Sequence, residues 1–266
     1  MGRRWYHEVS ADWLKARQGC LTATDIASLV PEYKRYLKQK DPDAIPPGFA
    51  ALWCQKHSNG FLDTSSPSSA AARGHIMEPY AVEEWNKWTG GYMYHWDDCI
   101  IINGSNGIGF SPDAANYPCP CRVKMGSVSD ECRAINSILE VKCYEPAAHM
   151  KAFVESTDAH KERMQAAVPF AVLPQLAAAT VLWYCPGAPV PMFSCTYSAA
   201  GLAEEIKMAF EIADLYRKVG ESIEDAIAND PLKFHPASLH TMYSEDGIYQ
   251  EWLASQVEND NVFIMR

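Results

Sequence analysis

The chain has 266 residues, 48% of them hydrophobic, so it is long enough to bury the core of one large domain with appendages. A formal net charge of −10 at pH 7 argues against a generally basic coat for nucleic acid, but it leaves room for a locally basic groove. No run of about 18 apolar residues occurs, and residues 1–6 are not followed by an apolar segment, so we expect no membrane span and no signal peptide.

Residues 10–30 predict a helix, a break and a second helix that Thr22 or Thr24 would cap. Arg17 would lie near the start of this second helix. Unpaired N–H groups at a helix start, together with a guanidinium group, make a good site for a phosphate. From spacing alone, an ordinary helical hairpin with Arg17 in a salt bridge is the simpler interpretation.

Residues 73–90 have the clearest helical pattern, and residues 50–57 predict a shorter helix before it. Apolar side chains recur along one face of the longer helix; they are Met77, Ala81, Trp85 and Trp88. Gly90 is expected to end the helix. Glu78 lies off the apolar stripe, and it is either a partner for the positive end of the helix dipole or an additional carboxylate for a metal site.

Residues 99–102 and 108–110 are expected to form a hairpin that leads to Asp113. Residues 137–143 alternate in polarity, which predicts a strand. One face carries Leu139, Val141 and Cys143 and should be the core face, and the other carries Ile138, Glu140 and Lys142. A carboxylate beside an ammonium group at the end of a buried strand is costly unless the two charges are used or paired.

Asp113 and the Glu140-x-Lys142 pattern suggest phosphodiester hydrolysis. This reaction needs a hard divalent cation, and Mg²⁺ prefers carboxylate, carbonyl and water oxygens. Asp113 and Glu140 would supply the carboxylates and Val141 a backbone carbonyl. Lys142 would orient the attacking water or stabilise negative charge. The alternative is a plain salt bridge at a strand end, because the bare pattern is common.

The nine cysteines are scattered, which fits a reducing cytoplasm better than a disulfide framework. Cys119, Cys121 and Cys132 lie in one segment and raise the question of zinc. A structural zinc site typically has four ligands in more widely spaced pairs, so this pattern argues against zinc. The role of the segment is left open.

The second half of the chain is expected to be mostly helical. Residues 164–180 predict an apolar helix broken near its prolines, with Gln175 directed either to a neighbouring backbone group or to the metal-site water or a phosphate. Residues 181–184 and 191–197 predict a hairpin. We expect a nuclease domain at residues 1–220 and an acidic helical extension at residues 221–266 that packs on it or mediates oligomerisation.

The order of these pieces resembles the YqaJ-type viral recombinase family, which includes the phage lambda-type alkaline exonucleases. The motifs that carry the resemblance are Trp13-Leu14-x-x-Arg17-x-Gly19, Leu21-Thr22-Ala23-Thr24-Asp25, Gly74-x-x-x-Glu78-Pro79, Ser111-Pro112-Asp113 and Leu139-Glu140-Val141-Lys142-Cys143, followed by Gln175. The sequence departs from the family's pattern where Thr24 replaces a serine and Ala114 a glycine, and where a long insert separates Asp113 from Glu140.

The resemblance implies a restriction-endonuclease-like α/β (α+β) core, with a central mixed sheet flanked by helices and with extra helices at both ends. It implies that Asp113 and Glu140 bind Mg²⁺ or Mn²⁺, with two ions in the site, supported by Glu78. It also implies that Lys142 positions the water, that Gln175 holds the lysine or the water, and that Arg17 and Thr24 grip a 5′-phosphate.

Such enzymes degrade one strand of linear duplex DNA from 5′ to 3′ and leave a 3′ single strand for an annealing protein. Many form trimeric rings around DNA, and a phage-encoded member would work in the host cytoplasm. Two alternatives remain. One is another nuclease on the same core, such as an endonuclease or a RecB-like enzyme with an iron–sulfur cluster, which the positions of the cysteines disfavour. The other is a non-catalytic DNA-binding protein.

Overall fold

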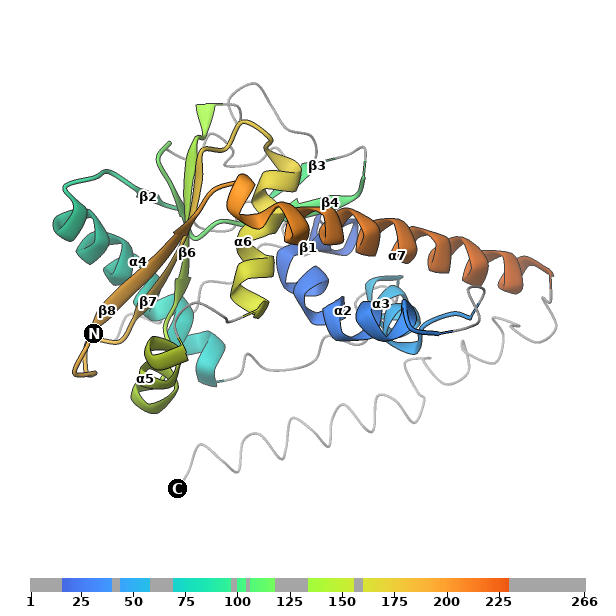
Figure 1. The fold of residues 1–266 in the computed structure, drawn as a ribbon, viewed down its shortest axis with the longest axis horizontal. Helices are drawn as coiled ribbons and strands as arrows, with labels where there is room; N and C mark the ends of the chain where they lie inside the picture. The colour runs from blue at the N-terminus through green and yellow to red at the C-terminus, as the bar shows by residue number, and fades with distance from the viewer. Residues whose placement is uncertain are drawn as a thin grey trace, which may run out of the picture. The chain divides into compact units, whose positions relative to one another are not determined.

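The computed structural model describes residues 16–39, 44–57, 69–96, 100–103, 106–117, 134–155 and 160–229 (Figure 1). Trp13 and Leu14, the cysteines of the insert and the tail after residue 229 lie outside this range. Contacts divide the chain into the units Met1–Val219 and Gly220–Arg266. None of the helices in the described part has the length and apolar character that crossing a lipid bilayer would require.

The larger sheet has five strands in the order β2 (Tyr94–His95), β5 (Ala114–Ala115), β6 (Ser137–Lys142), β7 (Ala178–Tyr184) and β8 (Met192–Tyr197). Strands β6 and β7 are parallel, and the other neighbours are antiparallel. A parallel pair needs a crossover connection, and α5 (Pro146–Glu155) and α6 (His160–Val172) provide it. The predicted hairpin after residue 181 is confirmed as β7 and β8.

Both faces of β6 are buried, which goes beyond the expected single core face. Leu139, Val141 and Cys143 pack with Ala81 and Val82 of α4 (Ser69–Thr89), as the alternation predicted. Ile138, on the other face, is also buried. Helices α4 and α6 lie on opposite sides of the sheet (Figure 1), which explains why a strand between them buries both faces. The polar residues Glu140 and Lys142 are therefore held in a largely buried setting.

Helix α4 ends at Gly90, whose φ of +66° suits a glycine. Met77, Ala81 and Trp85 pack in one core cluster, as predicted. The prediction for Trp88 was wrong, because this side chain is 63% exposed. Trp88 lies in the last turn, beyond the cluster, and its ring meets the edge of the Trp85 ring instead. The spacing of apolar residues predicts on which face of the helix a residue lies, but not how much of the helix length is packed against the core.

A second sheet has three strands in the order β1 (Leu21–Thr22), β4 (Ile108–Phe110) and β3 (Ile101–Asn103). Strands β3 and β4 form the predicted antiparallel hairpin. Strand β1 was not predicted, since its two residues were assigned to a break and a helix cap. It runs parallel to β4, so a tertiary contact, and not a local pattern, makes it a strand.

Gly109 permits the close approach of β1 to β4. A Cβ atom there would lie 2.8 Å from Cys20 Sγ and 3.2 Å from Ile102 Cγ1. Because Cys20 is buried and cannot move aside, Gly109→Ala is expected to lower the free energy of unfolding by about 1–3 kcal/mol in urea titrations. The control is Gly187→Ala, where a Cβ meets nothing within 4 Å and the effect should stay within about 0.5 kcal/mol. Equal effects at both positions would contradict this interpretation.

Further helices complete the described part of the fold. Helix α2 (Ala23–Tyr36) is capped by Thr22, as predicted, and α3 (Pro47–His57) follows it. Helix α7 (Ala203–Asn229) follows the short helix η2 (Ala200–Leu202) and continues across the boundary between the two units. The predicted division near residue 220 therefore falls inside a continuous helix. The packing of residues 221–266 on the domain stays a prediction.

Candidate functional site

The carboxylate of Asp113 lies against strand β6. Its Oδ2 accepts a hydrogen bond from the Val141 N–H at 2.6 Å. The pairing of β5 with β6 explains this position, because Ala114 lies opposite Leu139 and so places the preceding residue beside Glu140. The two segments, although far apart in the sequence, meet at one end of the sheet.

Glu140 and Lys142 are two residues apart on the same face of β6, as the alternation predicted. Lys142 Nζ donates a hydrogen bond to Glu140 Oε1 at 2.7 Å. The Glu140 side chain is 24% exposed and the Lys142 side chain 16%, so the ion pair is partly screened from water. The structure thus brings Asp113, Glu140 and Lys142 together around the end of β6. We call these three residues the carboxylate–lysine cluster.

Negative charge is crowded in this cluster. Burial raises the pKa of Asp113 well above its usual range, and the carboxylates of Glu140 and Glu78 raise it further. The Lys142 ammonium group and the Val141 N–H act in the opposite direction but do not compensate. For Lys142 itself, burial lowers the pKa, but the carboxylates of Glu140 and Asp113 outweigh burial, so its pKa is raised. A bound cation would relieve this repulsion.

Glu78 reaches the cluster from α4. Burial, followed by the negative charges of Glu78 and Asp113, raises the pKa of the Cys143 thiol to about 12, so Glu78 acts electrostatically at the end of β6. Arg73, more than one turn earlier in α4, anchors the helix there. It donates through Nε to Cys143 O at 3.2 Å and pairs with Glu145 at 2.9 Å. Sequence reasoning missed Arg73, although it directly precedes the Gly74 motif.

These oxygen donors suit a Mg²⁺ or Mn²⁺ ion that keeps part of its coordination for water and substrate. Mg²⁺ is usually held by one or two carboxylates, with waters and phosphate oxygens completing the shell. Asp113 and Glu140 provide two carboxylates and Val141 a carbonyl. Among the described residues, no three side chains of His, Cys, Asp or Glu form a ready metal-binding group. Two carboxylates and one carbonyl would leave further coordination positions of such an ion for water and a phosphate.

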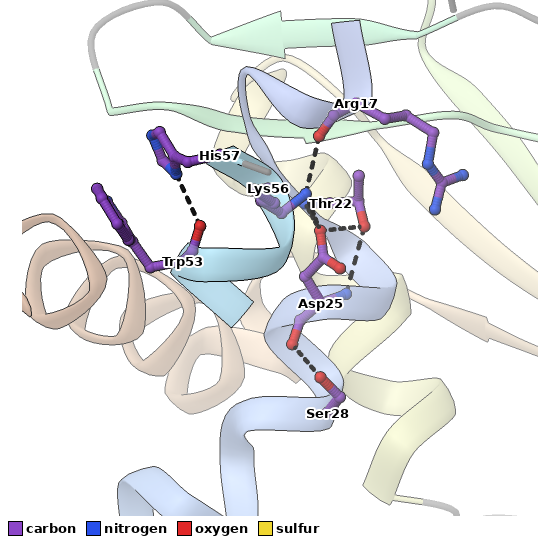
Figure 2. Close-up of polar contacts among 7 residues, drawn as sticks. All are labelled: Arg17, Thr22, Asp25, Ser28, Trp53, Lys56 and His57. Carbon is purple, nitrogen blue, oxygen red and sulfur yellow. Dashed lines mark hydrogen bonds and ion pairs between the residues drawn. The ribbon is translucent and has the colours of Figure 1, made fainter. Parts of the chain in front are cut away.

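A second polar region lies at the start of α2 (Figure 2). Thr22 and Asp25 form a capping box, in which the Thr22 hydroxyl accepts from Asp25 N at 3.3 Å and Asp25 Oδ2 accepts from Thr22 N at 2.8 Å. Thr24 is exposed in the first turn. Arg17 precedes β1, and its side chain extends away from Asp25 in this view. The structure thus places Thr24 in the first turn of α2 and Arg17 just before β1, the strand that leads into this helix.

The structure corrects the prediction for Gln175. The helix before it, α6, ends at Val172, so Gln175 lies in an exposed turn and not on a helix. It precedes Ala178, which pairs with Ser137 at the far end of β6. Along β6, Glu140 is three residues from Ser137, or about 10 Å at about 3.3 Å per residue, and Lys142 is five residues away, or about 16 Å. The error arose because periodicity does not separate a buried strand from a buried helix.

Gln165 occupies the kind of position that was expected for Gln175. It lies on α6, is 6% exposed, and its Nε2 donates to Thr24 Oγ1 at 3.2 Å. Its Oε1 atom is buried, and none of the described residues gives it a hydrogen bond. One turn earlier, Glu162 accepts a hydrogen bond from the hydroxyl of Tyr144, which follows the cluster on the chain. Helix α6 thus contacts both Thr24 at the start of α2 and Tyr144, two residues after Lys142. The sequence signal for Gln165 was an amide within an apolar run, the same signal that drew attention to Gln175.

Comparison with known proteins decides the family. The family model of the YqaJ-like viral recombinase domain matches residues 12–181. The chain belongs to the YqaJ-like viral recombinase family. The matched residues include Arg17, Thr24, Glu78 and the carboxylate–lysine cluster, and the C-terminal part lies outside the match. A comparison with curated protein sequences finds no match.

The YqaJ-like chain is also similar to solved exonuclease structures. These include the alkaline exonuclease LHK-Exo from Laribacter hongkongensis, alone and in complex with dAMP, both at 18% identity, with TM-scores of 0.56 and 0.58. Each match covers 83% of this chain and 99% of the other. A phage-related exonuclease from Haemophilus somnus 129PT matches with a TM-score of 0.54 at 11% identity, over 78% of this chain and 96% of the other. The predicted restriction-endonuclease-like α+β fold is confirmed.

Proposed function

We propose that this YqaJ-like protein is a metal-dependent exonuclease that degrades one strand of linear duplex DNA from 5′ to 3′. It would start at a 5′-phosphorylated end and leave a 3′ single strand for phage-type recombination. The observation that carries the proposal is the meeting of Asp113, Glu140 and Lys142 at one end of β6. Membership of a viral recombinase family and the likeness to alkaline exonucleases support it.

Asp113 and Glu140 would hold Mg²⁺ or Mn²⁺ together with the Val141 carbonyl, and Glu78 would support a second ion. The ions would neutralise the non-bridging phosphate oxygens and lower the pKa of a water. Lys142, already on the same face as Glu140, would orient the attacking water and stabilise negative charge that develops on the phosphate. The Val141 N–H keeps Asp113 fixed against the strand, so the carboxylate needs little reorganisation.

The start of α2 would bind the terminal 5′-phosphate. The first N–H groups of a helix lack partners within the helix, and the helix dipole favours an anion there. Arg17 would add a guanidinium group and Thr24 a hydroxyl group. Gln165, in place of Gln175, would connect this pocket with the catalytic end of β6, because it binds Thr24 from the helix that also carries Glu162. Linear duplex ends are thus the proposed substrate.

The proposed partners follow from the family. A single-strand annealing protein would receive the 3′ strand, and three copies of this chain would form a ring around DNA. The acidic charge of the whole chain suits a protein that holds DNA at a metal-loaded site more than along its entire surface.

An assay on linear, nicked and circular duplex DNA, with and without Mg²⁺, tests the proposal. Digestion of the linear form alone, only with the metal, and from the 5′ end of a labelled strand, would support it. Cleavage of closed circles would indicate an endonuclease instead. No digestion of any form, with metal present and the protein folded, would contradict nuclease function.

Arg17→Ala tests the phosphate pocket. The variant should lose most of the preference for 5′-phosphorylated over 5′-hydroxyl ends, about tenfold or more in kcat/KM, because charge-assisted contacts to an anion are worth about 1.5–3 kcal/mol. Arg35→Ala serves as a control, since Arg35 is exposed at the other end of α2 and pairs with Glu32. If Arg17→Ala treats both ends as wild type does, the pocket is wrongly assigned.

A further inference from the structure

We propose that Lys56 of α3 is a positioning residue that shapes the 5′-phosphate pocket without touching the phosphate. This inference rests on the proposed function, because it concerns how the same pocket is held. Lys56 lies in the last turn of α3, whereas the pocket residues come from elsewhere: Arg17 precedes β1, and Thr24 lies in the first turn of α2. The sequence pattern did not single out Lys56.

The Lys56 ammonium group holds two parts of the pocket at once. Nζ donates to the backbone carbonyl of Arg17 at 2.8 Å and pairs with Asp25 Oδ2 at 2.8 Å. In Figure 2, Lys56 lies between the Arg17 carbonyl and the Asp25 carboxylate. The side chain of Lys56 is only 10% exposed. The contact to Arg17 fixes the backbone from which the guanidinium group extends.

Asp25 explains why a cation is needed here. Its Oδ2 already accepts from Thr22 N and Thr22 Oγ1, both at 2.8 Å, which closes the capping box. This carboxylate in the first turn favours the helix, but it would repel a phosphate arriving at the same helix start. The Lys56 ammonium group neutralises it. Lys56 therefore allows one helix terminus to be capped by a carboxylate and still accept an anion.

The geometry favours positioning over direct phosphate binding. The ammonium group is directed to the Arg17 carbonyl and Asp25, and it is largely covered by protein. Arg17, by contrast, sends its side chain away from this pair in Figure 2. A lost positioning contact shifts the bound end relative to the reactive groups, and a displacement of about 1 Å can cost about a hundredfold in rate.

Lys56→Met tests the proposal, because methionine keeps an unbranched apolar side chain and removes the charge. The kcat/KM ratio for 5′-phosphorylated over 5′-hydroxyl ends should fall about tenfold, mainly through a lower kcat for phosphorylated ends, whereas loss of a direct phosphate contact would mainly raise KM. Lys56→Arg, which restores the charge, should recover part of the ratio. Lys87→Met is the control, since Lys87 pairs with Glu83 and Glu84 on the exposed side of α4, and its ratio should not change.

Thermal melting of each variant checks the fold. Removing one partner of a largely buried ion pair can destabilise a protein, so the double variant Lys56→Met/Asp25→Asn replaces the single variant if that fails to fold. Because this variant also removes the charge of Asp25, only the lost contact to the Arg17 carbonyl is then expected to lower the ratio. A lowered ratio in the folded variant supports the inference. A wild-type ratio in a folded variant overturns it while leaving the proposed function intact. If the wild-type protein degrades DNA without any preference for phosphorylated ends, the pocket and the inference both fail.

Discussion

Replacing Lys142 with alanine is expected to lower kcat for the digestion of linear duplex DNA by about a hundredfold to a thousandfold. Lys142 is held at 2.7 Å from Glu140 and lies within electrostatic reach of Asp113. In the proposed mechanism its ammonium group would stabilise the negative charge that develops on the phosphate. The binding of DNA ends should change little. Single-turnover digestion at saturating enzyme, with Mg²⁺ present, measures the loss.

Two controls make the result for Lys142→Ala decisive. Circular dichroism and thermal melting must show that the variant is folded, because an ion pair at the strand end is lost. Lys151→Ala, at an exposed position that pairs with Glu155 on α5, should digest DNA as wild type does. Wild-type activity of a folded Lys142→Ala variant would remove this lysine from the mechanism.

The second large effect is expected for Glu140→Gln. The amide keeps the size of the side chain but removes the charge, so the site should lose Mn²⁺ affinity and lose digestion by about a hundredfold or more. The fold should be retained, because removing one carboxylate also relieves the repulsion that raises the pKa of Asp113. Titration calorimetry with Mn²⁺ and the digestion assay measure the two losses independently.

Glu145→Gln is the matched control for Glu140→Gln. Glu145 follows the same strand and pairs with Arg73, but its side chain is exposed and it is not part of the carboxylate–lysine cluster. Its replacement should leave Mn²⁺ affinity and digestion near wild type. If Glu140→Gln binds Mn²⁺ and digests DNA like this control, Glu140 is not a metal ligand.

The parts of the fold that could be predicted are those that a local pattern specifies. The alternation in residues 137–143 gave strand β6 and its core face, and the cap at Thr22 followed from a hydroxyl before a helical run. The β3–β4 hairpin and the end of α4 at Gly90 likewise depend on nearby turn residues. In each case the sequence pattern and the element that it predicts lie within the same few residues.

The parts that could not be predicted depend on distant contacts. Strand β1 exists because β4 pairs with it, and the exposure of Trp88 depends on where the core cluster ends. Gln175 was assigned to a helix because the apolar run from α6 into β7 has no clear period, and Gln165 was not considered. The structure distinguishes the two glutamines, since Gln165 lies on α6 and donates to Thr24 of α2, whereas Gln175 follows the end of α6.

The candidate site divides in the same way. Asp113, Glu140 and Lys142 could be named from residue type and spacing, because carboxylates and a lysine at a strand end are costly without a use. Arg73 and Lys56 could not, since each acts on a backbone carbonyl from another element, Cys143 and Arg17 respectively. A contact to a backbone carbonyl cannot be predicted from the residue type of the partner, because every residue has such a carbonyl.

A crystal of this protein soaked in Mn²⁺ tests the central claim most directly, because the anomalous signal of manganese locates the ion. We expect a peak within about 2.3 Å of carboxylate oxygens of both Asp113 and Glu140, at the end of β6 beside Lys142. A protein that degrades linear DNA with Mn²⁺ but binds the ion elsewhere, with no peak between these two carboxylates, would contradict the account.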